Sequence, residues 1–297
     1  TEVPPITPPE SEKPHQTETP PPSGSDYSNL VLTDSEMDVV NIDDSFSPSE
    51  IRNSKFIRCT LNDNEKEYIF VVQKEFHFDN VEFVLTNSHV GAIKIDCTNE
   101  VKISNCKFTD CSVNSGNGNA IFVALHEQSN KKVIENCVFN SCGSQGFAVL
   151  ADDLIEMRNS NVTSSECGGF KIQKCGSSII NCHFSNLKSQ GAIYYYHQEQ
   201  KAELDEKFEI EKCTFENIDG IGCYFSVPTN SPDILIIKES NFVNCINKEQ
   251  SIDTNAIGII EDADSITLNI EQCEFRNCGT KGFVISLPLM KVKDDYQ

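Results

Sequence analysis

Two adjacent carboxylates, Asp152 and Asp153, and a later lysine, Lys171, are the residues of this chain best suited to acid–base chemistry on a polysaccharide. Glycoside hydrolysis uses a pair of carboxyl groups at a fixed separation, and a polysaccharide lyase needs a basic side chain beside calcium-binding acids. No column of aspartates recurs over three successive repeats, and adjacent aspartates in a loop more often form a solvated surface. We therefore assign no catalytic residue and keep these three as an enzymatic alternative.

A second acidic group lies in four segments of variable length, 126–132, 197–207, 227–233 and 261–265. Loops that vary in length on a rigid scaffold often carry binding function. A solvated surface would give the same pattern, and the aspartate-rich nonapeptide repeat of calcium-binding solenoids is missing. We predict no cofactor, with calcium on these loops as the alternative. The candidate binding residues are Glu127, Glu199, Glu203, Asp205, Glu206, Asp233, Glu261, Asp262 and Asp264.

Three consecutive tyrosines, Tyr194, Tyr195 and Tyr196, are candidates for stacking on sugar rings. Side chains alternate between the two faces of a strand, so at least one of the three must point into the core. One glycosylation sequon begins at Asn161, on an outward position of a predicted strand. The chain thus offers an aromatic surface and one modification site as candidates.

Ten of the 14 cysteines recur at fixed offsets from a central apolar residue. Some precede it (Cys106, Cys137, Cys182, Cys213 and Cys273) and others follow it (Cys59, Cys111, Cys142, Cys245 and Cys278). Pairs five residues apart and scattered histidines do not match a zinc site. Stacked small hydrophobic thiols explain the pattern, but neighbouring repeats would also bring such cysteines within disulfide range. Both alternatives stay open.

These residues must be positioned by a repeat that runs through most of the chain. The segment 103–111, Ile-Ser-Asn-Cys-Lys-Phe-Thr-Asp-Cys, recurs in variants. Its central apolar residue, here called the anchor, is found at Phe56, Phe83, Phe108, Phe139, Val162, Phe184, Phe215, Phe242 and Phe275. A period of a few tens of residues is typical of stacked-repeat proteins. Leucine is too scarce for a leucine-rich repeat.

Alternating apolar residues around each anchor predict short strands. An asparagine three residues before the anchor, as in Asn105 and Asn136, predicts a one-residue corner. A second motif, such as Gly91-Ala92-Ile93, predicts a sharp corner entering another strand. An all-β, single-stranded, right-handed parallel β-helix of about nine coils, a pectate-lyase-like solenoid, would bury this pattern. Equivalent side chains should then stack, with Phe108 on Phe139.

The pairing of Phe184-Ser185-Asn186 with Gly191-Ala192-Ile193 resembles the repeats of chlamydial polymorphic outer membrane proteins and similar surface proteins of parasitic protozoa. The resemblance covers roughly residues 50–290. It implies a β-helical, surface-exposed, non-enzymatic, adhesin-like module without catalytic residues. The chain departs from the bacterial repeats in having more cysteine and no membrane-barrel domain.

Composition and charge bound the remaining organisation. The net charge of −21 lacks a basic cluster, which argues against nucleic acid as a partner. No apolar run is long enough to span a membrane. The chain begins at Thr1 without a visible signal peptide, so we interpret it as a processed or excised ectodomain. We expect a disordered Pro/Thr/Ser-rich linker or stalk over 1–25, a cap region over 26–50, the β-helix over 51–290 and a polar tail over 291–297.

These patterns predict a non-enzymatic, extracellular or cell-surface module that binds an extracellular protein or glycan. The alternatives are a carbohydrate-active β-helix enzyme, lyase or hydrolase, and a purely structural surface stalk.

Overall fold

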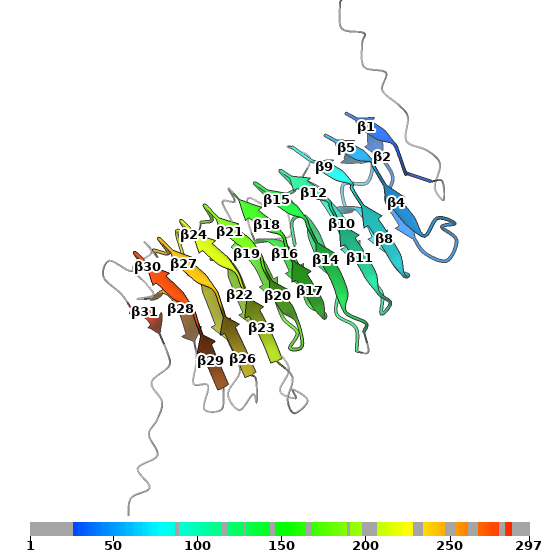
Figure 1. Ribbon diagram of the computed structural model, residues 1–297. Coiled ribbons are helices and arrows are strands. Elements are labelled where there is room, and N and C mark those ends of the chain that lie inside the picture. The colour runs from blue at the N-terminus through cyan, green and yellow to red at the C-terminus, as the bar shows by residue number, and fades with distance from the viewer. Residues whose placement is uncertain are drawn as a thin grey trace, which may run out of the picture.

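The chain forms a parallel β-solenoid without a helix in its described part (Figure 1). The computed structural model describes residues 26–86, 89–113, 118–127, 129–142, 146–163, 168–188, 191–197, 207–227, 234–246, 254–260, 267–278 and 283–286. The predicted linker over 1–25 and tail over 291–297 lie outside these ranges. Three long sheets contain ten, ten and nine strands, close to the predicted nine coils.

Each sheet collects one strand from successive coils, and its neighbouring strands pair in parallel. The anchor sheet consists of β1 (Val31–Thr33), β5 (Lys55–Ile57), β9 (Glu82–Val84), β12 (Lys107–Thr109), β15 (Val138–Asn140), β18 (Asn161–Thr163), β21 (His183–Ser185), β24 (Thr214–Glu216), β27 (Asn241–Val243) and β30 (Glu274–Arg276).

The second sheet contains the Ala-Ile motif and is called the Ala-Ile sheet. It consists of β3 (Val40–Ile42), β7 (Tyr68–Val72), β10 (Gly91–Ile95), β13 (Ile121–Val123), β16 (Phe147–Ala151), β19 (Gly168–Ile172), β22 (Ile193–Tyr196), β25 (Cys223–Ser226), β28 (Thr254–Ile260) and β31 (Phe283–Ser286).

The third sheet has charged side chains on its outer face and is called the ion-pair sheet. It consists of β4 (Glu50–Arg52), β8 (Phe76–Asp79), β11 (Val101–Ser104), β14 (Lys132–Glu135), β17 (Ile155–Arg158), β20 (Ser178–Ile180), β23 (Lys207–Glu211), β26 (Ile234–Lys238) and β29 (Thr267–Glu271). A fourth, two-stranded sheet pairs β2 (Glu36–Met37) with β6 (Thr60–Leu61).

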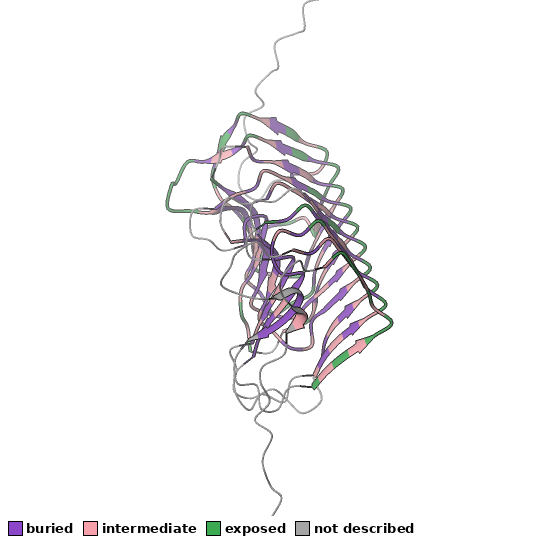
Figure 2. Cartoon of the chain, turned by 90° about the vertical axis from the view of Figure 1, so that its left-hand side faces the viewer, coloured by how far each residue is buried: buried purple, intermediate pink, exposed green. Residues whose placement is uncertain are grey.

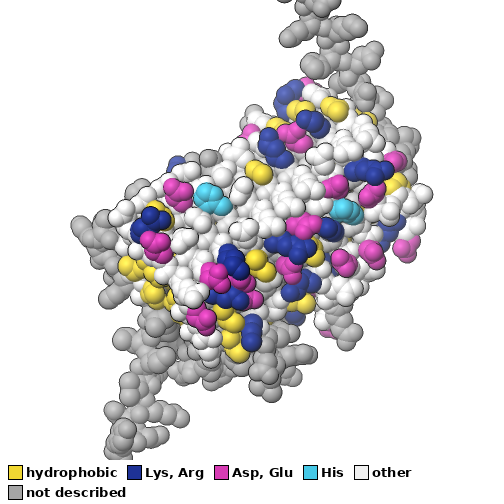
Figure 3. All heavy atoms as spheres, in the orientation of Figure 1, with side chains coloured by type: hydrophobic (Ala, Val, Ile, Leu, Met, Phe, Trp, Pro, Cys, Tyr) yellow, Lys and Arg dark blue, Asp and Glu magenta, His cyan; other side chains and the backbone are white. Residues whose placement is uncertain are grey.

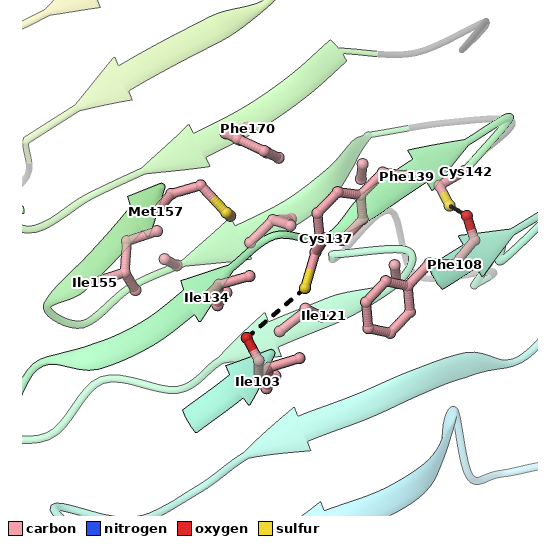
Figure 4. Packing of buried hydrophobic residues seen from close by; sticks show 14 of the residues in the cluster. Ile103, Phe108, Ile121, Ile134, Cys137, Phe139, Cys142, Ile155, Met157 and Phe170 are labelled. Atoms are coloured by element: carbon pink, nitrogen blue, oxygen red, sulfur yellow. Dashed lines mark hydrogen bonds between the residues drawn. The ribbon is translucent and has the colours of Figure 1, made fainter. Parts of the chain in front are cut away.

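The anchor residues stack through the centre of the solenoid, which confirms the predicted column (Figure 4). Phe108 and Phe139 are register partners, and their ring centroids lie 4.9 Å apart at an interplanar angle of 7°. The column is interrupted at Val162, which is too small to continue it. Phe170 from the Ala-Ile sheet fills this gap edge-on, 5.0 Å from Phe184. The core therefore keeps its density where the repeat sequence departs from its own pattern.

The predicted asparagine corners are confirmed. Asn105 and Asn136 have φ values of 57° and 55°, in the left-handed region that asparagine tolerates. Asparagine side chains of successive corners also hydrogen-bond to one another on the outside of the solenoid. At the corners of two earlier coils, for example, the Asn80 side-chain amide donates to the Asn53 side-chain oxygen at 2.9 Å. A second left-handed corner, two residues after the anchor at Asp110 and Ser141, was not predicted.

The glycine corners are confirmed only in part. Gly146 and Gly191 have φ values of 84° and 91°. Gly91 and Gly169 instead lie within strands β10 and β19, so the prediction of a left-handed corner at these two positions is wrong. Glycine is needed there for close approach, because a Cβ atom on Gly169 would lie 2.3 Å from the Ala192 carbonyl oxygen.

One continuous hydrophobic cluster fills the interior (Figure 2).

The structure describes all of the 14 cysteines except Cys167, and the described cysteines have free thiols. Among them Cys273 and Cys278 are half-buried, and the others are buried. At the first coil, residues 26–50 supply β1 to the anchor sheet and β3 to the Ala-Ile sheet. The rings of Tyr27 and Phe46 are buried at this end of the stack.

Candidate functional site

The structure separates the three residues of the enzymatic alternative. Asp153, just after β16, is fully buried and faces Lys132, with 3.7 Å between Oδ2 and Nζ. Asp153 Oδ1 accepts a hydrogen bond from the Leu154 backbone at 2.8 Å, and Lys132 donates to the Asn130 carbonyl at 2.7 Å. This buried pair is structural, so Asp153 cannot act with Asp152 on a bound substrate.

Asp152 remains near the outer face of the Ala-Ile sheet with Lys171. The pKa of the Asp152 carboxyl is raised, mainly because the group is partly buried. The positive charge of Lys171 lowers this pKa, and the negative charge of Asp153 raises it further. Asp152 Oδ1 is buried without a hydrogen-bond partner among the described residues. Asp152 is therefore a carboxyl group with a tendency to hold its proton, which is the state a proton donor needs.

The tyrosine triplet is divided as alternation requires. Tyr195 is fully buried and stacks on Phe208, with 4.5 Å between ring centroids, so it is no longer a candidate for sugar stacking. Tyr194 and Tyr196 are half-buried on the outer face. The Nζ atom of Lys171 lies 5.5 Å and 5.4 Å from their ring centroids, within cation–π range.

One further aromatic residue joins this group and was missed from the sequence. Tyr224 is the register partner of Tyr194 on β25, with ring centroids 5.0 Å apart. Its signal was present, since Tyr224 follows Cys223 as Tyr194 follows Ile193 in the preceding copy of the motif. We call Lys171, Tyr194, Tyr196 and Tyr224 the tyrosine patch.

The patch is extended by an aromatic ring from an earlier coil. Phe147 stacks with Tyr194 at 5.8 Å and lies across Gly168. A Cβ atom on Gly168 would lie 2.4 Å from this ring, so glycine makes the arrangement fit. Phe147 is buried and supports Tyr194 from within, whereas the half-buried rings of Tyr194, Tyr196 and Tyr224 lie at the surface near one amino group and one carboxyl group, a combination suited to sugar rings with polar substituents.

The other candidates are distributed elsewhere. Glu127 is exposed after β13, whereas Glu199, Glu203, Asp205, Glu206, Asp233, Glu261, Asp262 and Asp264 lie outside the described residues. Asn161 is exposed on β18 of the anchor sheet, outward as predicted, where it lines a shallow depression with His183 and Lys212. Within the described ranges, no three His, Cys, Asp or Glu side chains cluster as metal ligands do.

The ion-pair sheet presents a different outer face, with basic and acidic side chains interleaved (Figure 3). Glu135 accepts from Lys102 Nζ at 2.6 Å and from Arg158 Nε at 2.8 Å. Farther along, Lys238 lies 2.6 Å from Glu209. These ion pairs join successive coils. The charged groups on this face are therefore already paired with one another, which makes the face a weaker candidate for binding a ligand.

A serine and a histidine also meet on this sheet, which the sequence did not indicate. Ser104 Oγ lies 2.7 Å from His77 Nε2 and donates to Asp79 Oδ1 at 3.0 Å. A hydroxyl group has one proton to donate, so His77 is the donor to Ser104 and not its base. Ser104 is also buried, so this group resembles a hydrogen-bond network more than a nucleophile.

Comparison with known proteins supports the solenoid at family level. The sequence pattern of the family described as the right handed beta helix region matches residues 28–206 and 91–287, which together cover most of the chain. Neither the curated proteins nor the solved structures contain a match to the chain. Within the described residues, no helix is long and apolar enough to cross a membrane.

Proposed function

The chain belongs to the right-handed beta helix family, and from this basis we propose that it is a non-catalytic binding module displayed outside the cell. Its partner in this proposal is a glycan, bound on the outer face of the Ala-Ile sheet. The tyrosine patch is the observation that carries the proposal.

Tyrosine rings at a protein surface present an apolar face and a polar edge, which suits the alternating C–H and O–H groups of a sugar ring. Tyr194 and Tyr196 lie on β22 and Tyr224 lies on β25 of the next coil, so neighbouring rings can contact neighbouring sugar units. Lys171 and Asp152 add a donor and an acceptor beside them. The acidic composition and the polymorphic outer membrane protein-like repeats support an extracellular, adhesin-like role.

Glycan arrays and host cells probed with the purified chain test this proposal. We expect binding to a restricted set of glycans, reduced about tenfold or more by Tyr194→Ala and by Tyr196→Ala, because each loses a stacking contact. Arg158→Ala on the ion-pair sheet is the matched control and should bind as the unsubstituted chain does. Equal binding by all variants would exclude the patch, and no binding at all would favour a structural surface stalk.

A carbohydrate-active enzyme is the second candidate, because the raised pKa of Asp152 suits a general acid. Its weakness is the missing second carboxylate, since Asp153 points inward to Lys132. Release of reducing or unsaturated ends from acidic polysaccharides would reveal this activity. Asp152→Asn should abolish the activity while retaining glycan binding, and unchanged activity would remove Asp152 from the site.

A further inference from the structure

The arrangement that supports the tyrosine patch occurs a second time on the Ala-Ile sheet, three coils earlier. In the patch, the ring of Phe147 lies across Gly168 and stacks on Tyr194, and Lys171 lies on the strand between these two rings. We call these four residues the later platform. The earlier platform has the same four positions in the same order, and its residues are Tyr68, Gly91, Lys94 and Phe122.

The geometry of the earlier platform matches that of the later one. Tyr68 and Phe122 stack with their ring centroids 6.2 Å apart at an interplanar angle of 28°, and the two rings of the later platform also meet at 28°. A Cβ atom on Gly91 would lie 2.5 Å from the Tyr68 ring, so glycine makes this arrangement fit as well. The Tyr68 hydroxyl donates to the Gly118 carbonyl at 2.8 Å, which holds the buried supporting ring in place.

One column of outward positions joins the two platforms. Its register partners, from β7 to β25, are Val71, Lys94, Phe122, Leu150, Lys171, Tyr194 and Tyr224. A lysine followed by an aromatic ring therefore recurs after three coils, which is about 14 Å at the spacing of paired strands. The recurrence ends after two copies, because Gly258 occupies the position where a third lysine would lie.

The earlier platform lines a cavity of about 460 Å³, a size usual for small-molecule sites. Phe122 and Val71 contribute apolar surface to the cavity, Lys94 and Asn41 contribute hydrogen-bonding groups, and the segment 65–67 also lines it. The platform lies on β7, β10 and β13, and β3 and β16 pair with these strands on either side. Its geometry is therefore set by neighbouring coils and not by an end of the stack.

The charges around the earlier platform compensate one another, which favours an uncharged ligand. Lys94 pairs with Asp96 at 3.1 Å, and Lys66 in the cavity lining is flanked by Glu65 and Glu67. At the later platform a carboxyl group likewise accompanies the lysine. The net charge of −21 would in addition repel a polyanion. A neutral sugar needs only aromatic rings for its C–H faces and polar groups for its hydroxyls, and both platforms supply these.

We propose that the earlier platform is a second subsite, and that one neutral glycan chain contacts Phe122 and Tyr194 at the same time. The ligand class rests on the proposed function, whereas the second subsite, the uncharged ligand and its minimum length are additional. Once a glycan chain is held on one platform, its contact with the other becomes intramolecular. A chain that reaches both platforms should therefore bind much more tightly than a short one.

Calorimetric titration with cello-oligosaccharides of two to six glucose units tests the proposal. All ring substituents of these neutral glucans are equatorial, so both faces of each sugar offer C–H groups to an aromatic ring. We expect the affinity to rise at least about tenfold once the chain is long enough to span the two platforms. Phe122→Ala should abolish this rise and leave only the affinity of a short chain. Phe122→Tyr is the matched control, because it keeps an aromatic ring and should keep the rise.

Tyr194→Ala distinguishes the second subsite from the glycan site at the tyrosine patch, and it should also abolish the rise. A rise that persists in Phe122→Ala and is lost in Tyr194→Ala would overturn the second subsite and leave the patch as proposed. The reverse result would overturn both the joint site and the patch. No binding of any member of the series to the unsubstituted chain would overturn a neutral glycan as the ligand. Circular dichroism of each variant confirms that the solenoid is intact.

Discussion

On the outer face of the ion-pair sheet, charged side chains of one coil pair with those of the next, as Glu135 does with Lys102 and Arg158. On the outer face of the Ala-Ile sheet, aromatic rings stack instead, and Asp152 has a buried oxygen without a hydrogen-bond partner among the described residues. Both faces cover the same hydrophobic core. The two faces therefore differ in the contacts between their coils, ion pairs on one and stacked rings on the other, and the second is the face that we propose to bind a ligand.

Removal of the link between the two sheets should have the largest effect. Lys132 begins β14 in the ion-pair sheet, whereas Asp153 follows β16 in the Ala-Ile sheet, and both are fully buried. Asp153→Asn leaves the ammonium group of Lys132 buried without its counter-charge, and we expect a loss of about 3–5 kcal/mol in the free energy of unfolding. Urea denaturation at unchanged m-value measures this loss.

The paired substitution Lys132→Met with Asp153→Asn is the control, because it removes both charges together. It should recover most of the lost stability, since buried ion pairs are often replaceable by apolar groups. A loss below about 1 kcal/mol for Asp153→Asn alone would contradict the view that this pair joins the sheets.

A smaller effect is expected within the Ala-Ile sheet from Gly168→Ala. The new Cβ atom would lie 2.4 Å from the ring of Phe147, which must then move away from Tyr194. We expect a loss of about 1–3 kcal/mol in stability and a changed near-ultraviolet dichroism of the tyrosines. Val133→Ala, at an outer position of the ion-pair sheet, should change stability by less than about 0.5 kcal/mol. Equal losses of stability for Gly168→Ala and Val133→Ala would contradict the view that the aromatic rings of the Ala-Ile sheet are more tightly packed than the outer side chains of the ion-pair sheet.

The fold was predictable because its signals repeat. The aromatic anchors and the asparagine corners recur in coil after coil, and one backbone geometry satisfies every copy. The second corner also carried a signal, because asparagine occupies it at Asn186, Asn217, Asn244 and Asn277, but it was missed since residues as different as Asp110 and Ser141 occupy it in earlier coils. No single residue type identifies a left-handed backbone when the hydrogen bonds of neighbouring coils impose it.

The site was only partly predictable, because it depends on contacts between coils. Alternation in a strand was enough to divide Tyr195 from Tyr194 and Tyr196. The inward turn of Asp153 depends on Lys132, which comes from an earlier coil and occupies an inward position that the pattern reserves for apolar residues. Such a pairing has no local sequence signal, and sequence adjacency to Asp152 suggested the wrong partner.

The ion pairs should make a modest, pH-dependent contribution. Hydrogen bonding to Lys102 is the main reason that the pKa of Glu135 is lowered in the folded chain, with Arg158 adding to it. A lowered pKa gives stability that is present above the ordinary glutamate pKa and is lost as the pH falls through the folded-state value. Glu135→Gln should therefore cost about 1 kcal/mol at neutral pH and nothing in acid. Glu274→Gln, at an exposed pair with Arg276, is the control and should have no effect.

Asp152 should show the opposite pH dependence, and the smallest effect. Burial raises its pKa, so its ionised form is disfavoured in the folded chain, and its contribution to stability is full in acid and lost as the pH rises through the folded-state pKa. Asp152→Asn removes this loss and should stabilise the chain at neutral pH by less than about 1 kcal/mol, because solvent screens a half-buried carboxyl group. Urea midpoints of both variants across a pH series measure the two slopes. Slopes of the same sign would contradict this difference, since opposite signs require the charged form of Glu135 to be stabilised by its ion pairs and the charged form of Asp152 to be disfavoured by burial.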